Sequence, residues 1–265
     1  MENTKIRIAA IGDVHGCMEE LEELLQKIGF YDGKIDKIIF VGDLIDKGPD
    51  PVGVMTWAKK WASCCFFVMG NHEEKHLRYH MHERRVKKNP KYRNPMTVSE
   101  DFLRTRQALL EIKDWDAFAF MDTWNHYHYL LDEGNHLVLH GGLLPGIKAE
   151  DMPPKIITRV RYLKSETEMA HIDEITDTMP FWTDKYTGPE KIIFGHQPMF
   201  EVHSAPYAVG IDLGCVHGNK LCAYLLHENT FVTVPAKKTY FPLKISSTGK
   251  LGAGWKKGFM GAGDD

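Results

Sequence analysis

Five short glycine-containing blocks constrain this chain more than any other feature. Each lies beside or after an apolar run, and each supplies an Asp, Asn or His. In chain order they are Gly12-Asp13-Val14-His15-Gly16, Gly42-Asp43-Leu44-Ile45-Asp46, Gly70-Asn71-His72-Glu73, His140-Gly141-Gly142 and Gly195-His196. Any one block alone is compatible with an ordinary turn. Carboxylates, imidazoles and an amide together are a ligand set for divalent metals, so the joint pattern favours a shared metal site.

The first part of the chain predicts a β-α-β-α-β arrangement. Residues 6–11, 37–41 and 64–69 are apolar runs typical of strands, and residues 18–28 carry leucines at helical spacing. Residues 51–62 predict a helix that begins at a proline. In open α/β sheets, ligands bind beyond the carboxyl ends of the strands, where the first three blocks fall.

The middle of the chain, about residues 73–126, has no strand pattern and predicts a helical cap insertion. Residues 75–93 are rich in Lys and Arg, and residues 98–112 read as an amphipathic helix. Strands are expected again at 136–139, 191–194, 207–213, 220–226 and 230–234. We therefore expect one domain over residues 1–243, whose cap selects substrate, followed by a loosely ordered Gly/Lys-rich tail at 244–265.

Composition narrows the class of protein. The chain has 265 residues, of which 43% are hydrophobic, so it can bury a sizeable core. A net charge of −3 and the lack of any membrane-length apolar run argue against an extensive nucleic-acid footprint and a membrane partner. The five cysteines are odd in number and form no Cys-x-x-Cys pair, which favours a reducing cytoplasm.

The five blocks, in this order, resemble the motifs of the calcineurin-like metallophosphoesterases, in the branch of the Ser/Thr phosphoprotein phosphatases. The segment Asp212-Leu213-Gly214-Cys215-Val216-His217-Gly218-Asn219-Lys220-Leu221 resembles the small prokaryotic and phage members. Those include lambda-type protein phosphatase, bacterial diadenosine tetraphosphate hydrolases and the phosphatase domain of polynucleotide kinase-phosphatase. The resemblance implies an α/β sandwich of two mixed β-sheets flanked by helices.

The resemblance also implies roles for individual residues. One metal would be held by Asp13, His15 and Asp43, and the second by Asp43, Asn71, His140 and His196. His72 would be the general acid, supported by Asp46, and we expect Glu73 to orient His72. The ligand set suits manganese first, with Fe, Zn, Ni or Mg as alternatives.

Lys47 departs from the family pattern, because an arginine usually follows the second aspartate of this block. Lysine is a point charge and cannot reproduce the bidentate contact of arginine with phosphate. We expect Lys47 to bind phosphate through a single donor. Arg159 and Arg161 are the candidates for a second phosphate-binding arginine, although both are equally compatible with surface charge.

The implied reaction is hydrolysis of a phosphate ester or anhydride by a hydroxide that bridges two metals. The leading hypothesis is a Ser/Thr protein phosphatase-like enzyme acting on phosphoproteins. An alternative is a dinucleoside polyphosphate hydrolase, which the basic stretch 75–93 favours because extra phosphates need cations; the same stretch also fits a solvated helix face. Further alternatives are a nucleic-acid end phosphatase and a non-catalytic phosphate-binding protein, and the complete ligand set argues against the latter.

Overall fold

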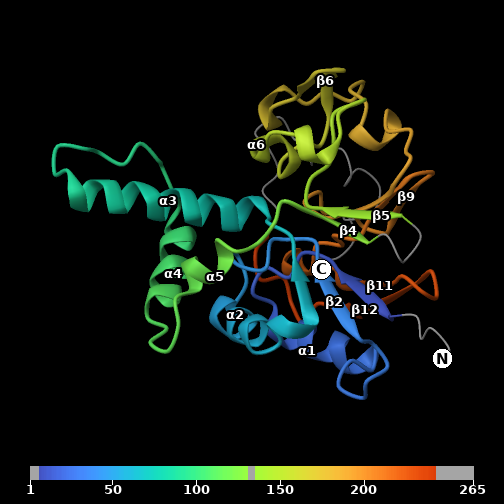
Figure 1. Ribbon diagram of the computed structural model, residues 1–265, viewed down its shortest axis with the longest axis horizontal. Coiled ribbons are helices and arrows are strands. Elements are labelled where there is room, and N and C mark those ends of the chain that lie inside the picture. The colour runs from blue at the N-terminus through green and yellow to red at the C-terminus, as the bar shows by residue number, and fades with distance from the viewer. Residues whose placement is uncertain (1–5, 131–134, 243–265) are drawn as a thin grey trace, which may run out of the picture.

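The protein is described by a computed structural model over residues 6–130 and 135–242 (Figure 1). The predicted tail at 244–265 lies outside these residues. The strands form two five-stranded sheets, and both sheets mix parallel with antiparallel pairs. A separate two-stranded ribbon pairs β6 (Leu163–Ser165) with β7 (Glu168–Met169).

The first sheet has the strand order β12-β11-β1-β2-β3. Its strands are β1 (Ile8–Ile11), β2 (Lys37–Phe40), β3 (Cys65–Phe67), β11 (Lys220–Leu225) and β12 (Thr230–Pro235). The first three strands are parallel, as expected for strands joined by helical crossovers. Strands β11 and β12 return antiparallel and extend the sheet beyond β1.

The second sheet has the order β4-β5-β8-β10-β9. Its strands are β4 (Tyr127–Leu130), β5 (His136–Leu139), β8 (Lys191–Phe194), β9 (His203–Ala205) and β10 (Ala208–Gly210). Strands β5, β8 and β10 are parallel, whereas β4 and β9 pair antiparallel at the two edges. Strand β10 is shorter than the predicted run at 207–213, because the chain leaves the ladder after Gly210.

Side chains alternate between two cores along each central strand. In β1, Ile8 and Ala10 face the core between the sheets, whereas Ile11 packs under the helices of the first sheet. Val138 and Ile193 enter the same inter-sheet core from the second sheet. Because both faces of these strands are buried, their sequences are continuous apolar runs. The architecture confirms the expected sandwich of two mixed sheets flanked by helices.

Helices α1 (Met18–Lys27) and α2 (Pro51–Lys60) pack against the first sheet. The side chain of Asp50 caps α2 by accepting a hydrogen bond from the Gly53 amide at 2.7 Å. The short helix α6 (Pro154–Ile157) belongs to the core on the outer side of the second sheet. None of the helices in the described part of the chain combines the length and apolar character needed to cross a bilayer.

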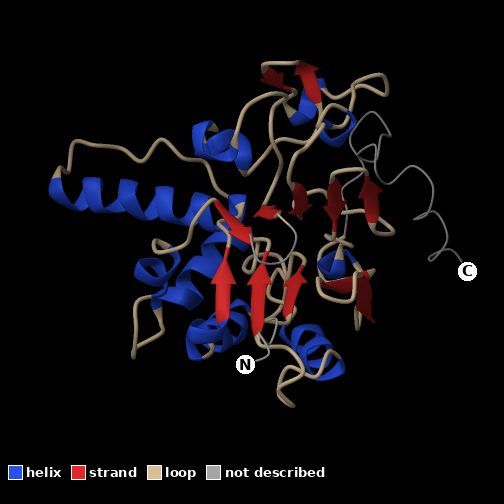
Figure 2. Ribbon diagram, turned by 45° about the vertical axis from the view of Figure 1, so that its right-hand side comes forward, coloured by secondary structure: helices blue, strands red, loops and turns tan. Residues whose placement is uncertain are grey.

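Three helices follow the third strand: α3 (Asn71–Lys88), α4 (Glu100–Leu110) and α5 (Ala117–Met121). Helix α3 begins at the sheets and projects well beyond them (Figures 1 and 2), and α4 and α5 lie below it in Figure 1. The His76 ring stacks on Phe102 of α4, with 3.9 Å between ring centroids. Arg106 of α4 pairs with Glu83 of α3. These contacts fix one side of α3 against the other two helices.

The outer core of the first sheet should dominate the stability of the fold. Leu24 in α1 is fully buried, whereas Leu103 in α4 is 44% exposed. We expect Leu24→Ala to lower the free energy of unfolding by about 3 kcal/mol, because it leaves a cavity, and Leu103→Ala to lower it by less than about 0.5 kcal/mol. Urea unfolding of both variants measures the difference, and equal losses would contradict this assignment of the core.

Candidate active site

The polar blocks meet where the parallel strands of the two sheets end. Asp13, Asp43 and Asn71 follow β1, β2 and β3 of the first sheet, while His140 and His196 follow β5 and β8 of the second. The His196 amide donates to both carboxylate oxygens of Asp13, at 3.3 and 3.1 Å, so the two sheets are joined here directly. The candidate site therefore lies at the shared edge of the sandwich.

Asp43 lies at the centre of the group. Its Oδ2 is 3.3 Å from His140 Nε2 and 3.6 Å from His15 Nε2, and its Oδ1 accepts a hydrogen bond from the His72 amide at 3.0 Å. Burial opposes ionisation of this carboxyl, yet the imidazoles around it hold the pKa of Asp43 well below its usual range. Asp43 is therefore a buried carboxylate placed between two sets of nitrogen donors.

Backbone carbonyls fix the tautomers of three histidines. The pairs are His15 Nδ1 with Ile45 O at 2.8 Å, His140 Nδ1 with Val41 O at 2.9 Å, and His196 Nε2 with Arg159 O at 3.1 Å. A carbonyl only accepts, so the paired nitrogen carries the proton and the other nitrogen keeps a lone pair. Such a partner is the usual device that presents an imidazole to a metal.

The free nitrogen of His140 faces other acceptors, whereas Lys47 Nζ lies 2.8 Å from His15 Nε2 and an Arg161 nitrogen lies 3.3 Å from His196 Nδ1. His140 Nε2 lies 3.1 Å from Asn71 Oδ1 as well as close to Asp43. Ligand atoms of His15, Asp43 and His72 lie within 4.8 Å of one another, and so do those of Asp43, His140 and His196. Acceptors that converge in a buried site repel one another unless a cation lies between them, so the donor set fits two divalent metals that share Asp43.

Asp13 adds a further carboxylate to this site. Burial, together with the neighbouring Asp212 and Asp43 carboxylates, raises the pKa of Asp13 well above its usual range. Asp212 itself follows β10, and burial raises its pKa to about 6. The accumulation of buried carboxylates favours bound cations, as expected of a metal centre.

His72 is oriented by Asp46. Its Nδ1 lies 2.7 Å from Asp46 Oδ2, while His76 Nε2 binds the other oxygen, Oδ1, at 2.8 Å. Burial opposes the ionised form of Asp46, but the two imidazoles outweigh it and hold the pKa of this carboxyl far below its usual range. An ionised Asp46 keeps the His72 ring fixed, with Nε2 turned toward Asp43 at 3.9 Å from Oδ2.

Glu73 does not orient His72, contrary to the expectation from their adjacency. Its two carboxylate oxygens accept four backbone amides, from Asp43 at 2.9 Å, Leu44 at 2.9 Å, Ile45 at 3.2 Å and Gly70 at 3.1 Å. Successive side chains at the start of a helix point in different directions, so Glu73 turns into the protein while His72 faces the site. Glu73 therefore shapes the loop that carries Asp43.

The candidate phosphate-binding cations lie around this centre. Lys47 Nζ is 2.8 Å from His15 Nε2, so the lysine reaches the site directly. Arg161 donates to the His196 carbonyl at 3.1 Å, and burial lowers the pKa of Arg161 to about 10, although the surrounding carboxylates oppose this. Arg159 is turned toward α3, where it pairs with Glu74. Lys47 and Arg161 thus border the centre, and Arg159 lies at its margin.

Two glycines allow the polar blocks to approach this closely. A Cβ on Gly195 would lie 2.0 Å from Asp13 Oδ1. Gly42 has a φ of 106°, and a Cβ there would lie 2.8 Å from both the Gly70 backbone and His140 Nδ1. No larger side chain fits at either position without moving the site.

Sequence reasoning missed three residues of this site: His76, Asp212 and Glu74. A signal existed for His76, because His72 and His76 are four residues apart and share one face of α3. Asp212 follows a strand that ends in Gly210, so it fits the same pattern as the other blocks. Nothing in the sequence indicates the pairing of Glu74 with Arg159, since the two are far apart along the chain.

Glu73 offers a direct test of how the loop is held. Glutamine in its place has one acceptor oxygen, and its amide hydrogens would face backbone N–H donors. We expect Glu73→Gln to lower the free energy of unfolding by about 2–4 kcal/mol, because buried amides lose their partners. Chemical denaturation measures this loss. Glu19→Gln, at an exposed position of α1, is the matched control and should change little. A wild-type midpoint for Glu73→Gln would contradict the role of these amide contacts.

Comparison with known proteins agrees with this geometry. The relatives include the bis(5'-nucleosyl)-tetraphosphatases PrpE (asymmetrical) of Oceanobacillus iheyensis, 28% identical over 91% of this chain and 97% of the relative, and of Bacillus subtilis, 27% identical over 87% and 95%. A crystal structure named "putative diadenosine tetraphosphatase" superposes with a TM-score of 0.70 at 28% identity, covering 89% of this chain and 96% of that one.

A yeast Ser/Thr phosphatase structure shares the fold, with a TM-score of 0.53 at 14% identity over 91% of this chain and 81% of that one. The family model for calcineurin-like phosphoesterases matches residues 6–234, which include every polar block of the site. The chain is a member of the calcineurin-like phosphoesterase family and a hydrolase of phosphate esters or anhydrides.

Proposed function

We propose that this protein hydrolyses dinucleoside tetraphosphates asymmetrically, to a nucleoside triphosphate and a nucleoside monophosphate. The observation that carries the proposal is that relatives named as asymmetrical tetraphosphatases match almost their whole length, not merely the metal-binding blocks. The comparisons thus favour the alternative over the leading hypothesis of a Ser/Thr protein phosphatase. The yeast phosphatase supports the shared fold alone, since its identity is 14%.

The residues of the site fit this chemistry. Asp13, His15 and Asp43 would hold one divalent ion, and Asp43, Asn71, His140 and His196 the other. Such ions, when bound, acidify water and offset phosphate charge. A water molecule loses one proton to solvent, and the oxygen of the resulting hydroxide bonds to one phosphorus. The bond from that phosphorus to the bridging oxygen breaks, and the departing phosphate takes the electron pair.

The proton for the departing phosphate comes from His72. Its Nδ1 is held by Asp46, so Nε2 is the nitrogen that can donate. Lys47 and Arg161 would bind the non-bridging oxygens as charge-assisted donors. We keep manganese as the proposed metal and the cytoplasm as the proposed compartment; the five cysteines, all free, suit a reducing environment.

The choice of substrate can be settled by one side-by-side assay. We expect the manganese-supplemented protein to convert diadenosine tetraphosphate to ATP and AMP with a kcat/KM at least about tenfold above that for a phosphoserine peptide or a 3′-phosphorylated oligonucleotide. Chromatography of the nucleotides identifies the products. Faster turnover of the phosphopeptide would restore the protein-phosphatase hypothesis, and production of ADP alone would contradict asymmetrical cleavage.

Two substitutions separate metal binding from proton transfer. His72→Ala should lower kcat by about 10²–10⁴-fold while the metal content stays at the wild-type level, because the general acid is lost and the ligands remain. Asp43→Asn should lower both turnover and metal content, since the shared carboxylate loses its charge. Elemental analysis of the purified proteins distinguishes the two cases. Loss of metal from His72→Ala would instead make His72 a ligand.

A further inference from the structure

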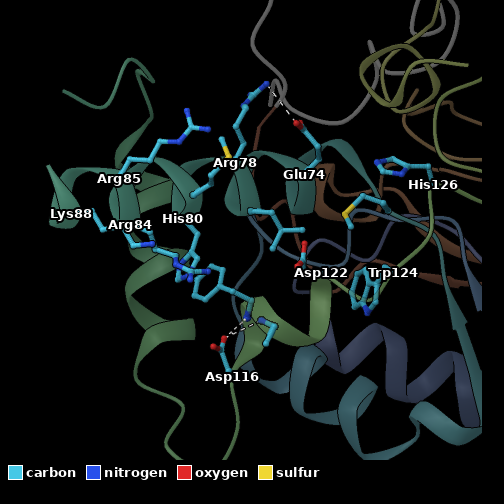
Figure 3. Close-up of a pocket in the computed structure, with 15 residues that line it drawn as sticks. Glu74, Arg78, His80, Arg84, Arg85, Lys88, Asp116, Asp122, Trp124 and His126 are labelled. Atoms are coloured by element: carbon cyan, nitrogen blue, oxygen red, sulfur yellow. Dashed lines mark hydrogen bonds and ion pairs between the residues drawn. The ribbon is translucent and has the colours of Figure 1, made fainter. Parts of the chain in front are cut away.

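A groove of about 820 Å³ runs along α3, outside the metal centre (Figure 3). This volume lies in the range typical of small-molecule sites. Its walls come from α3, from α5 and from the segment around Trp124 and His126. The cations that line it are Arg78, Arg84, Arg85 and Lys88. The basic stretch of the sequence is therefore more than a solvated face, because these cations share a groove with apolar side chains.

Helix α3 begins at Asn71 in the metal centre, and its later turns line the groove. Asn71, Arg78 and Arg85 follow one another at intervals of seven residues, so they fall on the same helical face. With a rise of 1.5 Å per residue, Arg85 lies about 20 Å along the helix from Asn71. A ligand that extends from the metal centre on the Asn71 side passes these cations in turn.

Ion pairs of Glu74 lie between the metal centre and the groove. Glu74 lines the groove and pairs with Arg159, whose guanidinium also approaches the Asn71 carbonyl at 3.5 Å. On its other side Glu74 forms an ion pair with Arg78 at 3.6 Å. A dashed line marks this ion pair in Figure 3. The carboxylate of Glu74 is thus shared between two arginines, one at each side of the junction. This arrangement leaves positive charge on the path between the metal centre and the groove.

The groove also has an apolar part suited to a nucleoside. Leu77, Met81, Phe118 and Ala119 line it, and Met81 is 41% exposed, so its side chain is accessible to a ligand. Asp122 lies on the same wall and is exposed, so its carboxylate can accept hydrogen bonds from ribose hydroxyls. An inorganic anion would leave this apolar surface uncovered.

We propose that the groove binds the nucleoside triphosphate half of the substrate, with its phosphates passing Arg78 first, its nucleoside over Leu77 and Met81, and Arg84, Arg85 and Lys88 lining the groove beyond it. The inference rests on the proposed function and adds to it the position of the larger product. Four cations suit three phosphates better than one, so the monophosphate half stays at the metals. Lys87 and Arg93 lie outside this groove and line a different cavity, between α3 and the segment 92–94.

The test compares two triple variants of equal charge. The groove variant changes Arg84, Arg85 and Lys88 to Gln, and the control changes Lys87, Lys91 and Arg93 to Gln. Both remove three positive charges from the same region, so long-range electrostatic effects are matched. Glutamine is close to Arg and Lys in helix propensity, so α3 is preserved in both. Circular dichroism and metal content verify that each variant is folded and loaded.

Two readouts carry the result. The first is the ratio of kcat/KM for diadenosine tetraphosphate to kcat/KM for p-nitrophenyl phosphate, which should fall about tenfold in the groove variant through a higher KM and stay at the wild-type level in the control. The second is inhibition of p-nitrophenyl phosphate hydrolysis at a fixed free metal concentration. ATP should inhibit the wild type and the control more strongly than AMP or inorganic tripolyphosphate does, and the groove variant should lose this preference.

Each outcome bears on the proposal separately from the function it rests on. Equal effects in both triple variants would overturn it, because charge alone would then explain the loss. Inhibition by tripolyphosphate as strong as by ATP would overturn the placement of the nucleoside. If the wild type fails to cleave diadenosine tetraphosphate, the proposed function falls, yet the inhibition experiment still decides whether the groove holds a nucleoside triphosphate.

Discussion

The buried carboxylate of Glu73 is the interaction on which the site depends. The loop after β2 has to turn sharply to present Asp43, and its amides at positions 43 to 45 find no partner in a sheet or helix. Glu73 supplies the acceptors from the first turn of α3. The same carboxylate also binds the Gly70 amide, so one side chain joins the loops after β2 and β3. Without it, buried amides would be left unpaired, at a cost of several kcal/mol.

The conformation of these loops also determines how the charged and polar side chains of the centre are arranged. The loops place a backbone carbonyl beside each of three histidines, and this carbonyl fixes which ring nitrogen carries the proton. The other nitrogen of each ring therefore presents its lone pair to the centre. Asp43 is the point they share, and Asp13 binds the loop of His196 across the sandwich. The centre is assembled from both sheets and neither sheet holds it alone. The packing between the two sheets therefore helps to hold the active site together, although the strands that pack are far apart in the sequence.

Much of this could be predicted from the sequence, for a physical reason. Strands that are buried on both faces have continuous apolar sequences, and a polar residue directly after such a strand lies at the edge of the sheet. The positions of Asp13, Asn71 and His196 therefore follow from local sequence patterns. The role of Glu73 was predicted wrongly because three of its four partners lie about thirty residues earlier, whereas its adjacency to His72 suggested a nearer one. Strand β4 went unpredicted because Tyr127, His128 and Tyr129 are only half-buried at a sheet edge and form no apolar run.

Helix α3 also sets a geometric rule for how such a protein can vary. Its first turn carries Asn71 and His72, whereas its later turns carry the cations of the groove, and a rigid rod connects the two. Deleting or adding one residue between them would rotate the far end by about 100° and turn the groove away from the metals. Insertions of about one or two whole turns would preserve the alignment and lengthen the span by about 5 Å per turn. In the proposed binding mode, the length of α3 would set the distance from the metal-binding residues to the groove, and this distance could change in steps while the chemistry stays the same.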